Sequence, residues 1–420
     1  MLFRSMKFAP TLLFKYTQQR ENFHIYDLSL CTRKLKVMSK QELDAISFLV
    51  SRTTSSLSLE TVPTFAKCDM SMSQAIRQQR TSLFQSVSDT ITTIELENMP
   101  YIVECINAIP DRARQNISKL RLGYPNLFGY YHHISGNEND TIKTTSSYVC
   151  ELPALRTFEC TFTDNDTFQA LLSSFLPHES VLCVEIKYYG RFSFTNKEAQ
   201  MLHAFAPNTE RLEISFFHLA DIQMFTCLRH IDARAMNLTS NVHFPVLESI
   251  YIGVFMHETK NIAISSANVQ DNHTIIAPNI RVIECDADFA ELSTIRIVNL
   301  PRLTEITTSV CQMKVANVPK LTKMSICART FIDVYDSILV RGINAVEINA
   351  PSIKELDLKF NQISDSGWII CMEKFNELVR YMTLERVRIF RISTYAQGFI
   401  DLNGMELPYC KHLEVHFLSS

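Results

Sequence analysis

The hydrophobic positions of this chain recur in a fixed register behind proline. Eight prolines precede apolar residues at the fifth and usually the second and seventh positions, which gives the pattern P-x-φ-x-x-φ-x-φ. Because side chains alternate between the faces of a strand, positions five and seven face one side and the residue between them faces the other. The pattern predicts eight short strands, with first core residues Phe158, Leu212, Ile250, Ile283, Ile306, Met324, Leu356 and Leu413.

Copies of the pattern without the proline extend the repeat from Ile91 nearly to the end of the chain. Several copies start 19 to 28 residues apart, as Leu155 and Val181 or Leu228 and Leu247 do. Such spacing is typical of a solenoid, in which each coil buries its apolar side chains against neighbouring coils. We therefore assign residues 86–420 to a solenoid and residues 1–85, which lack the repeat, to a mixed, partly helical N-terminal cap.

Within the cap, Ser39 and Glu42 form a capping box ahead of an apolar-periodic run and predict a helix. A second amphipathic helix is expected over residues 73–86. The Ser/Thr-rich tract Thr53–Ser58 between them is predicted to be a turn or loop.

Two rows of strands alternate between residues 275 and 358. The pairs that begin at Ile306 and Met324 lie 18 residues apart, and the pairs that begin at Ile295 and Met313 fall between the rows with the same separation. A coil this short that already holds two strands has no room for a helix, so we expect two β walls joined at proline corners. A helix is expected again at residues 366–382, and Leu413–Phe417 is the expected closing strand.

The run I-K-E-L-D-L-K-F-N from Ile353 to Asn361, continued by Ile363, Asp365 and Gly367, resembles the leucine-rich repeat consensus L-x-x-L-x-L-x-x-N-x-I. The coils at 275–330 look like the short, two-β-walled repeats of some bacterial surface antigens and many protist proteins. This resemblance covers roughly residues 90–418. It implies an α/β solenoid of stacked parallel strands, a ladder asparagine at Asn361, and protein binding through the strand face.

Composition narrows the possible functions. The net charge of −3 arises from 41 basic and 44 acidic residues, so no overall field attracts nucleic acid or anionic lipid. No stretch approaches the roughly 18 apolar residues of a membrane span. The twelve cysteines contain no C-x-x-C pair and are interpreted as reduced, which favours a cytoplasmic protein. The basic, acid-free first twenty residues leave a mitochondrial location as the alternative.

No phosphate-binding, dinucleotide-binding, zinc-protease or nucleophile-elbow motif occurs in the sequence. His132 and His133 lack a cysteine or carboxylate at a zinc-ligand spacing. His412 and His416 would stand about 13 Å apart on a strand, too far to share a metal ion. We expect no enzyme activity, catalytic residue, metal or cofactor, and a small-molecule ligand is disfavoured.

The functional surface is predicted on the outward positions of the strands, where both charge signs are interspersed. Such a surface suits a protein partner, and Tyr251 with Arg229 and Arg234 is its expected anchor, because Tyr and Arg dominate interface hot spots. An alternative is a ubiquitin-ligase adaptor whose residues 1–85 bind a scaffold. The candidate partner-binding residues are Arg211, Glu213, Arg229, His230, Asp232, Arg234, Tyr251, Arg281, Glu284, Lys323, Lys354 and Asp357.

Overall fold

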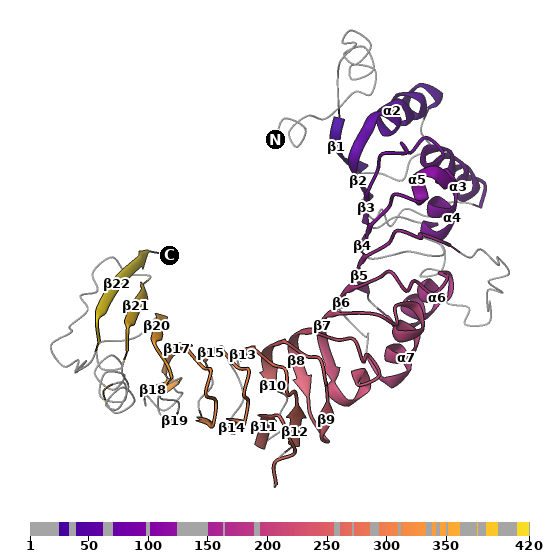
Figure 1. Cartoon of the computed structure of the whole chain (residues 1–420). Helices are drawn as coiled ribbons and strands as arrows, with labels where there is room; N and C mark the ends of the chain where they lie inside the picture. The colour runs from indigo at the N-terminus through magenta and orange to yellow at the C-terminus, as the bar shows by residue number, and fades with distance from the viewer. Residues whose placement is uncertain are drawn as a thin grey trace. The chain divides into compact units, whose positions relative to one another are not determined.

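The computed structural model of the chain is shown in Figure 1. It describes residues 25–32, 39–61, 70–97, 101–123, 150–162, 164–188, 194–255, 261–270, 273–285, 294–309, 312–332, 338–341, 345–349, 352–361, 376, 384–393 and 410–419. The chain divides into two compact units, Met1–Thr209 and Glu210–Ser420. We call them unit 1 and unit 2 and treat each by itself.

Unit 1 alternates parallel strands with helices. Its strands are β1 (Ile25–Thr32), β2 (Thr53–Thr61), β3 (Thr93–Glu97), β4 (Lys119–Gly123), β5 (Thr157–Phe162) and β6 (Cys183–Tyr188). Each strand pairs in parallel with the next. The helices are α2 (Lys40–Arg52), α3 (Met70–Phe84), α4 (Ile102–Asn107), α5 (Asp111–Arg114), α6 (Asn165–Ser173) and α7 (Asn196–Phe205). In Figure 1 these helices lie along one side of the strands and leave the other side open.

The expected helices of the N-terminal region are confirmed as α2 and α3, but the loop expected at Thr53–Ser58 is wrong. That tract forms the first part of strand β2, which pairs with β1 and β3. Leu57 and Leu59 are buried, and the serines that alternate with them lie on the opposite side. Strand pairing and burial of two leucines therefore outweigh the turn preference of a Ser/Thr-rich tract.

Phenylalanines fill the space between strands and helices in unit 1. The ring of Phe158 on β5 lies 5.0 Å from the ring of Phe205 on α7, and Phe162 lies 4.9 Å from Phe168 on α6. Both contacts are edge-to-face, the arrangement that aromatic quadrupoles favour. Helix α6 begins where the Asp164 carboxylate accepts a hydrogen bond from Thr167 N at 2.7 Å.

Unit 2 contains nine parallel strands in its first row. They are β7 (Arg211–His218), β8 (His230–Asn237), β10 (Ser249–Phe255), β13 (Val282–Cys285), β15 (Glu305–Thr308), β17 (Lys323–Ile332), β20 (Glu355–Asn361), β21 (Arg386–Ser393) and β22 (His412–Ser419). The short strand β18 (Ile338–Arg341) pairs with the end of β17 in the antiparallel direction. Asn361, the expected ladder asparagine, is the last residue of β20.

The predicted strand register of unit 2 is confirmed. Its first core residues stand directly opposite one another in the order Leu212, Ile231, Ile250, Ile283, Ile306, Met324, Leu356, Val387 and Leu413. Residues from Leu212 to Val387 in this column are at most 2% exposed, whereas Leu413 is 45% exposed. The expectation that Leu413 points into the core therefore holds for its register but not for its burial.

The second row of strands is also confirmed. A separate parallel sheet runs in the order β19 (Ala345–Asn349), β16 (Gln312–Ala316), β14 (Thr294–Val298), β11 (Asn261–Ser265), β12 (His273–Ile276) and β9 (Val242–His243). Before β9, the wall opposite the first row is instead the short 3-10 helix η2 (Leu219–Ile222). The expected helix at residues 366–382 lies outside the described residues except for Asn376, which is helical.

Coil length decides which kind of wall forms. A residue advances the chain by about 1.5 Å in a helix and about 3.3 Å in a strand, so a strand crosses a wall with fewer residues. In unit 1, the step from Phe158 to Val184 spans 26 residues and holds α6, whereas the step from Ile306 to Met324 in unit 2 spans 18 and holds β16. Both units are thus sheet-rich solenoids of stacked parallel strands.

Two asparagines turn the chain at the corners of the short coils. Asn299 follows β14 with φ 56°, Asn317 follows β16 with φ 55°, and the Asn317 amide donates to Asn299 Oδ1 at 2.7 Å. Asparagine tolerates this left-handed conformation better than most residues other than glycine. Pro301 and Pro319 follow directly in the turns. Sequence reasoning identified the prolines of these corners but missed the asparagines.

Among the helices that the structure describes, none is both long and apolar enough to cross a membrane.

Candidate functional site

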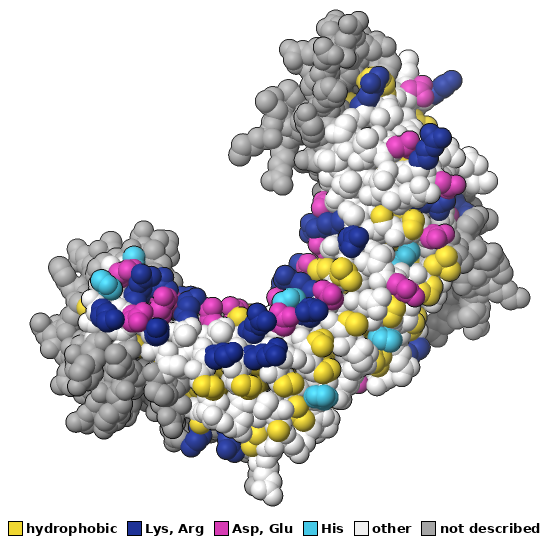
Figure 2. Space-filling model, viewed as in Figure 1, with side chains coloured by type: hydrophobic (Ala, Val, Ile, Leu, Met, Phe, Trp, Pro, Cys, Tyr) yellow, Lys and Arg dark blue, Asp and Glu magenta, His cyan; other side chains and the backbone are white. Residues whose placement is uncertain are grey.

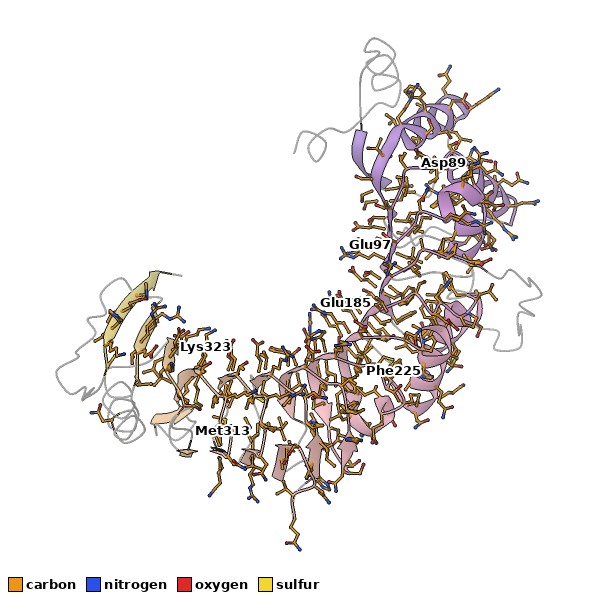
Figure 3. All side chains as sticks on the ribbon, viewed as in Figure 1. Asp89, Glu97, Glu185, Phe225, Met313 and Lys323 are labelled. Carbon is orange, nitrogen blue, oxygen red and sulfur yellow. The ribbon has the colours of Figure 1, made fainter. Side chains whose placement is uncertain are left out.

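The strand face of unit 2 is the set of first-row side chains that point away from the core. Its middle column lies between the two core positions of each strand and consists of Glu213, Asp232, Tyr251, Glu284, Thr307, Ser325, Asp357, Arg388 and Glu414. Figure 2 shows basic and acidic side chains interspersed over these strands. In Figure 3, Lys323 lies on this face and Met313 on the second wall.

All twelve predicted residues belong to unit 2. Arg211 and Glu213 lie on β7, His230, Asp232 and Arg234 on β8, Tyr251 on β10, Glu284 on β13, Lys323 on β17 and Asp357 on β20, while Arg229, Arg281 and Lys354 lie directly before or near the start of β8, β13 and β20. The register therefore brings them onto one continuous face, with successive strands about 4.8 Å apart.

Arg229 bridges the coils on both sides of it. Its guanidinium lies 2.7 Å from the Glu248 carboxylate and 3.7 Å from that of Glu210. Beside it, His230 Nδ1 and Ser249 Oγ are 2.8 Å apart. Arg229 and His230 are thus already engaged by neighbouring strands, which reduces what either can offer to a partner.

Asp357 is the most strongly engaged of the predicted residues. Its two carboxylate oxygens accept from Arg388 Nε at 2.7 Å and from Arg388 Nη2 at 2.9 Å, and the residue is only 7% exposed. This hydrogen bonding raises the pKa of Arg388 above its ordinary value. A bidentate pair between adjacent strands fixes both side chains and makes Asp357 part of the coil-to-coil contact.

Other charges toward the C-terminal end of the face are paired in the same way. Lys323 forms an ion pair with Glu305 on the preceding strand, and Lys354 Nζ lies 3.3 Å from the Glu385 carboxylate. Each of these pairs joins equivalent positions on adjacent coils. They are exposed or half-buried, so each contributes little to stability but reduces the uncompensated charge.

Four predicted residues remain exposed or outward-facing without an ion pair to any described residue. Arg211, Arg234, Arg281 and Glu284 are all exposed, and they lie within or beside β7, β8 and β13. Tyr251 stands at the centre of this group on β10 and is half-buried. We call these five residues the β7–β13 patch.

Gly253 allows the strands under this patch to come close together. An added Cβ at Gly253 would lie 2.4 Å from the backbone oxygen of Arg234 and 3.1 Å from its Cα. The register between β8 and β10 is regular on both sides of this point. Only glycine therefore fits beside the backbone that carries the Arg234 side chain.

Unit 1 has a strand face of its own that the sequence prediction omitted. Lys119 Nζ lies 2.6 Å from the Glu159 carboxylate, Arg121 Nε lies 3.8 Å from it, and Lys187 pairs with Glu185. Figure 3 shows Glu97 and Glu185 on the side of the strands opposite the helices. The signal was present, since Glu159 and Glu185 stand between the two apolar residues of a repeat copy.

The described residues offer little reactive chemistry. Burial raises the pKa of the Cys105 and Cys150 thiols to about 12, so neither is a thiolate near neutral pH. Cys410 Sγ donates to the His412 carbonyl at 3.2 Å. Within the described ranges, no three His, Cys, Asp or Glu side chains are arranged to hold a metal ion. His132 and His133 lie outside those ranges.

In comparison with known proteins, no family model matches the chain and no curated protein matches it.

Proposed function

We propose that this chain is a non-enzymatic protein-binding module of the leucine-rich-repeat type that binds a partner through the strand face of unit 2. The proposal joins the resemblance of the Ile353–Asn361 run to the repeat consensus with the parallel strand stack. Parallel strands without helices on their outer side present a broad, regular surface, which suits a protein surface better than a small molecule.

The observation that carries the proposal is the uneven pairing of charge on this face. Near β15–β22, Lys323, Lys354 and Asp357 are engaged by neighbouring coils. In the β7–β13 patch, Arg211, Arg234, Arg281 and Glu284 are exposed without an ion pair to a described residue. Arginines beside a tyrosine form the kind of group that dominates protein interfaces. We infer that partner contacts concentrate on this patch.

The test is affinity capture with the full chain from the cells that produce it, followed by mass spectrometry. A partner retained by the wild-type chain should be lost when Arg234→Glu and Arg281→Glu are combined. The matched control is the double variant Arg302→Glu and Lys320→Glu, which makes the same charge change at exposed corner residues outside the patch. Equal capture by the patch variant and the wild-type chain would remove this surface from consideration.

The adaptor hypothesis makes a different prediction from the same assay. It requires residues 1–85 to bind a scaffold, and exposed Lys40 and Asp44 on α2 are available for such contact. Because β2 pairs with β3, a fragment ending at residue 85 would lose its strand partner, so the full chain is the proper reagent. Loss of a ubiquitin-ligase scaffold from a Lys40→Glu and Asp44→Lys variant, with capture by the patch unchanged, would support the adaptor role.

A further inference from the structure

Strand β22 leaves apolar core positions of unit 2 uncovered. Ile306, Met324, Leu356 and Val387 occupy one core column and are each 0% exposed, whereas Leu413 in the same column is 45% exposed. A solenoid coil buries its apolar side chains against a coil on either side. Among the described residues, β21 covers one side of β22 and nothing covers the other.

The backbone of β22 has a hydrogen-bonding edge to match. His412 N donates to Glu385 O at 3.1 Å, as Arg386 N donates to Lys354 O one strand earlier. Since backbone groups of successive residues point to alternate sides of a strand, His412, Glu414 and His416 are directed at β21. Leu413, Val415 and Phe417 therefore direct their N–H and C=O groups to the outer edge, where no described strand pairs with them.

The second sheet of unit 2 shows how an edge is protected elsewhere in the same unit. Its edge strand β9 has only two residues, and the side chain of Gln223 accepts a hydrogen bond from His243 N at 3.2 Å. Strand β22 has eight residues, contains no proline, and carries a single formal charge at Glu414. Long edges without such protection pair readily with another strand.

We propose that β22 pairs with β22 of a second copy of this chain, in antiparallel orientation about a two-fold axis at Val415. This register sets Glu414 opposite His416 of the second copy, and symmetry repeats the pair. It also sets Leu413 opposite Phe417 of the second copy, on the core side of the strand. The edge-facing N–H and C=O groups of Val415 then form the central hydrogen-bonded pair.

Charge decides between this register and its neighbours. An axis at Glu414 would place two carboxylates opposite each other, and an axis at His416 would pair two imidazoles. Like charges directly opposite are destabilising, whereas opposite charges contribute favourably. The surroundings of Glu414 do not fully neutralise it, because Arg386 lies 3.6 Å away and His416 of the same strand 3.5 Å away, both beyond hydrogen-bonding distance. A strand with this alternation is complementary to itself.

The first test is the mass of the full chain, measured by light scattering after gel filtration over a concentration series. The wild-type chain should form dimers, and Val415→Pro, which removes an edge-facing N–H, should weaken the dimer at least about tenfold. Val415→Ala keeps the N–H and is the matched control, with circular dichroism as the check on folding. A wild-type monomer, open-ended oligomers, or equal dimerisation of the Pro and Ala variants would overturn the proposal.

A charge exchange provides a second test that does not depend on proline being tolerated. His416→Glu sets two carboxylates opposite each other at both ends of the ladder and should weaken the dimer about fivefold. Adding Glu414→His to that variant exchanges the two side chains and should restore dimerisation to near the wild-type level. If the exchanged variant dimerises no better than the single variant, β22 does not pair in this register.

Discussion

Replacing Gly253 with alanine should destabilise unit 2 through a single backbone contact. The new Cβ would lie 2.4 Å from Arg234 O, where about 3.5 Å is an ordinary separation. Because the obstructing atom belongs to the backbone of the adjacent strand, it cannot rotate away. Overpacking of this kind costs about 1–3 kcal/mol, of which about 0.4–1 kcal/mol is offset by the lower entropy of the unfolded alanine chain. The expected net loss is about 1–2 kcal/mol.

Gly123 provides the control for this prediction. Its added Cβ would lie 2.9 Å from Glu97 Cγ, which belongs to an exposed, flexible side chain. Gly123→Ala should therefore be neutral or slightly stabilising. At about 2–4 °C per kcal/mol for a unit of this size, Gly253→Ala should lower the unfolding midpoint in a calorimetric scan by roughly 2–8 °C. Equal midpoints for the two variants would refute the close approach of β8 and β10.

Three further predictions follow from other contacts. A double-mutant cycle with Asp357→Ala and Arg388→Ala should give a coupling of about 1–2 kcal/mol in urea unfolding, against less than about 0.5 kcal/mol for the exposed Lys354 and Glu385 pair. Asn317→Ala should cost about 1–2 kcal/mol because φ is 55°, while Asn317→Gly should cost less; similar losses would contradict the left-handed corner. Burial lowers the pKa of His178 from its ordinary value of 6.5, so its contribution to stability is complete above that pH and declines as the pH falls toward the folded-state pKa. His178→Phe should therefore lose less stability than the wild-type chain between pH 7.5 and 5; an identical pH dependence would exclude this role.

The strand register could be predicted because it depends on local alternation of side chains. Ile283, Ile306 and Met324 recur behind proline, and the coils that carry them are too short to permit another arrangement. Thr53–Ser58 could not be assigned correctly, because its strand exists through pairing with β1 and β3, which are distant in sequence. Asn299 and Asn317 occur 18 residues apart, and that spacing could have identified the corner ladder.

The candidate site shows the same limit more sharply. Outward positions were predictable, but the state of each charge depends on which strand lies next to it. Asp357 has a polar neighbour on each side in the middle column, and only the 31-residue step to Arg388 shows that it is held by an arginine.

Charge pairing between coils therefore separates two roles that the sequence shows as one mixed column. A charge that faces an opposite charge on the next coil holds the solenoid together, as Asp357 and Lys323 do. A charge whose neighbours do not complement it, such as Arg234 or Arg281, contributes little to the stack and remains exposed to a partner. Exchanging charges within a pair should therefore alter stability and leave binding intact, whereas substitution in the β7–β13 patch should alter binding and leave stability intact. Opposite results for the two groups would show that pairing within the stack does not determine which residues are free to bind.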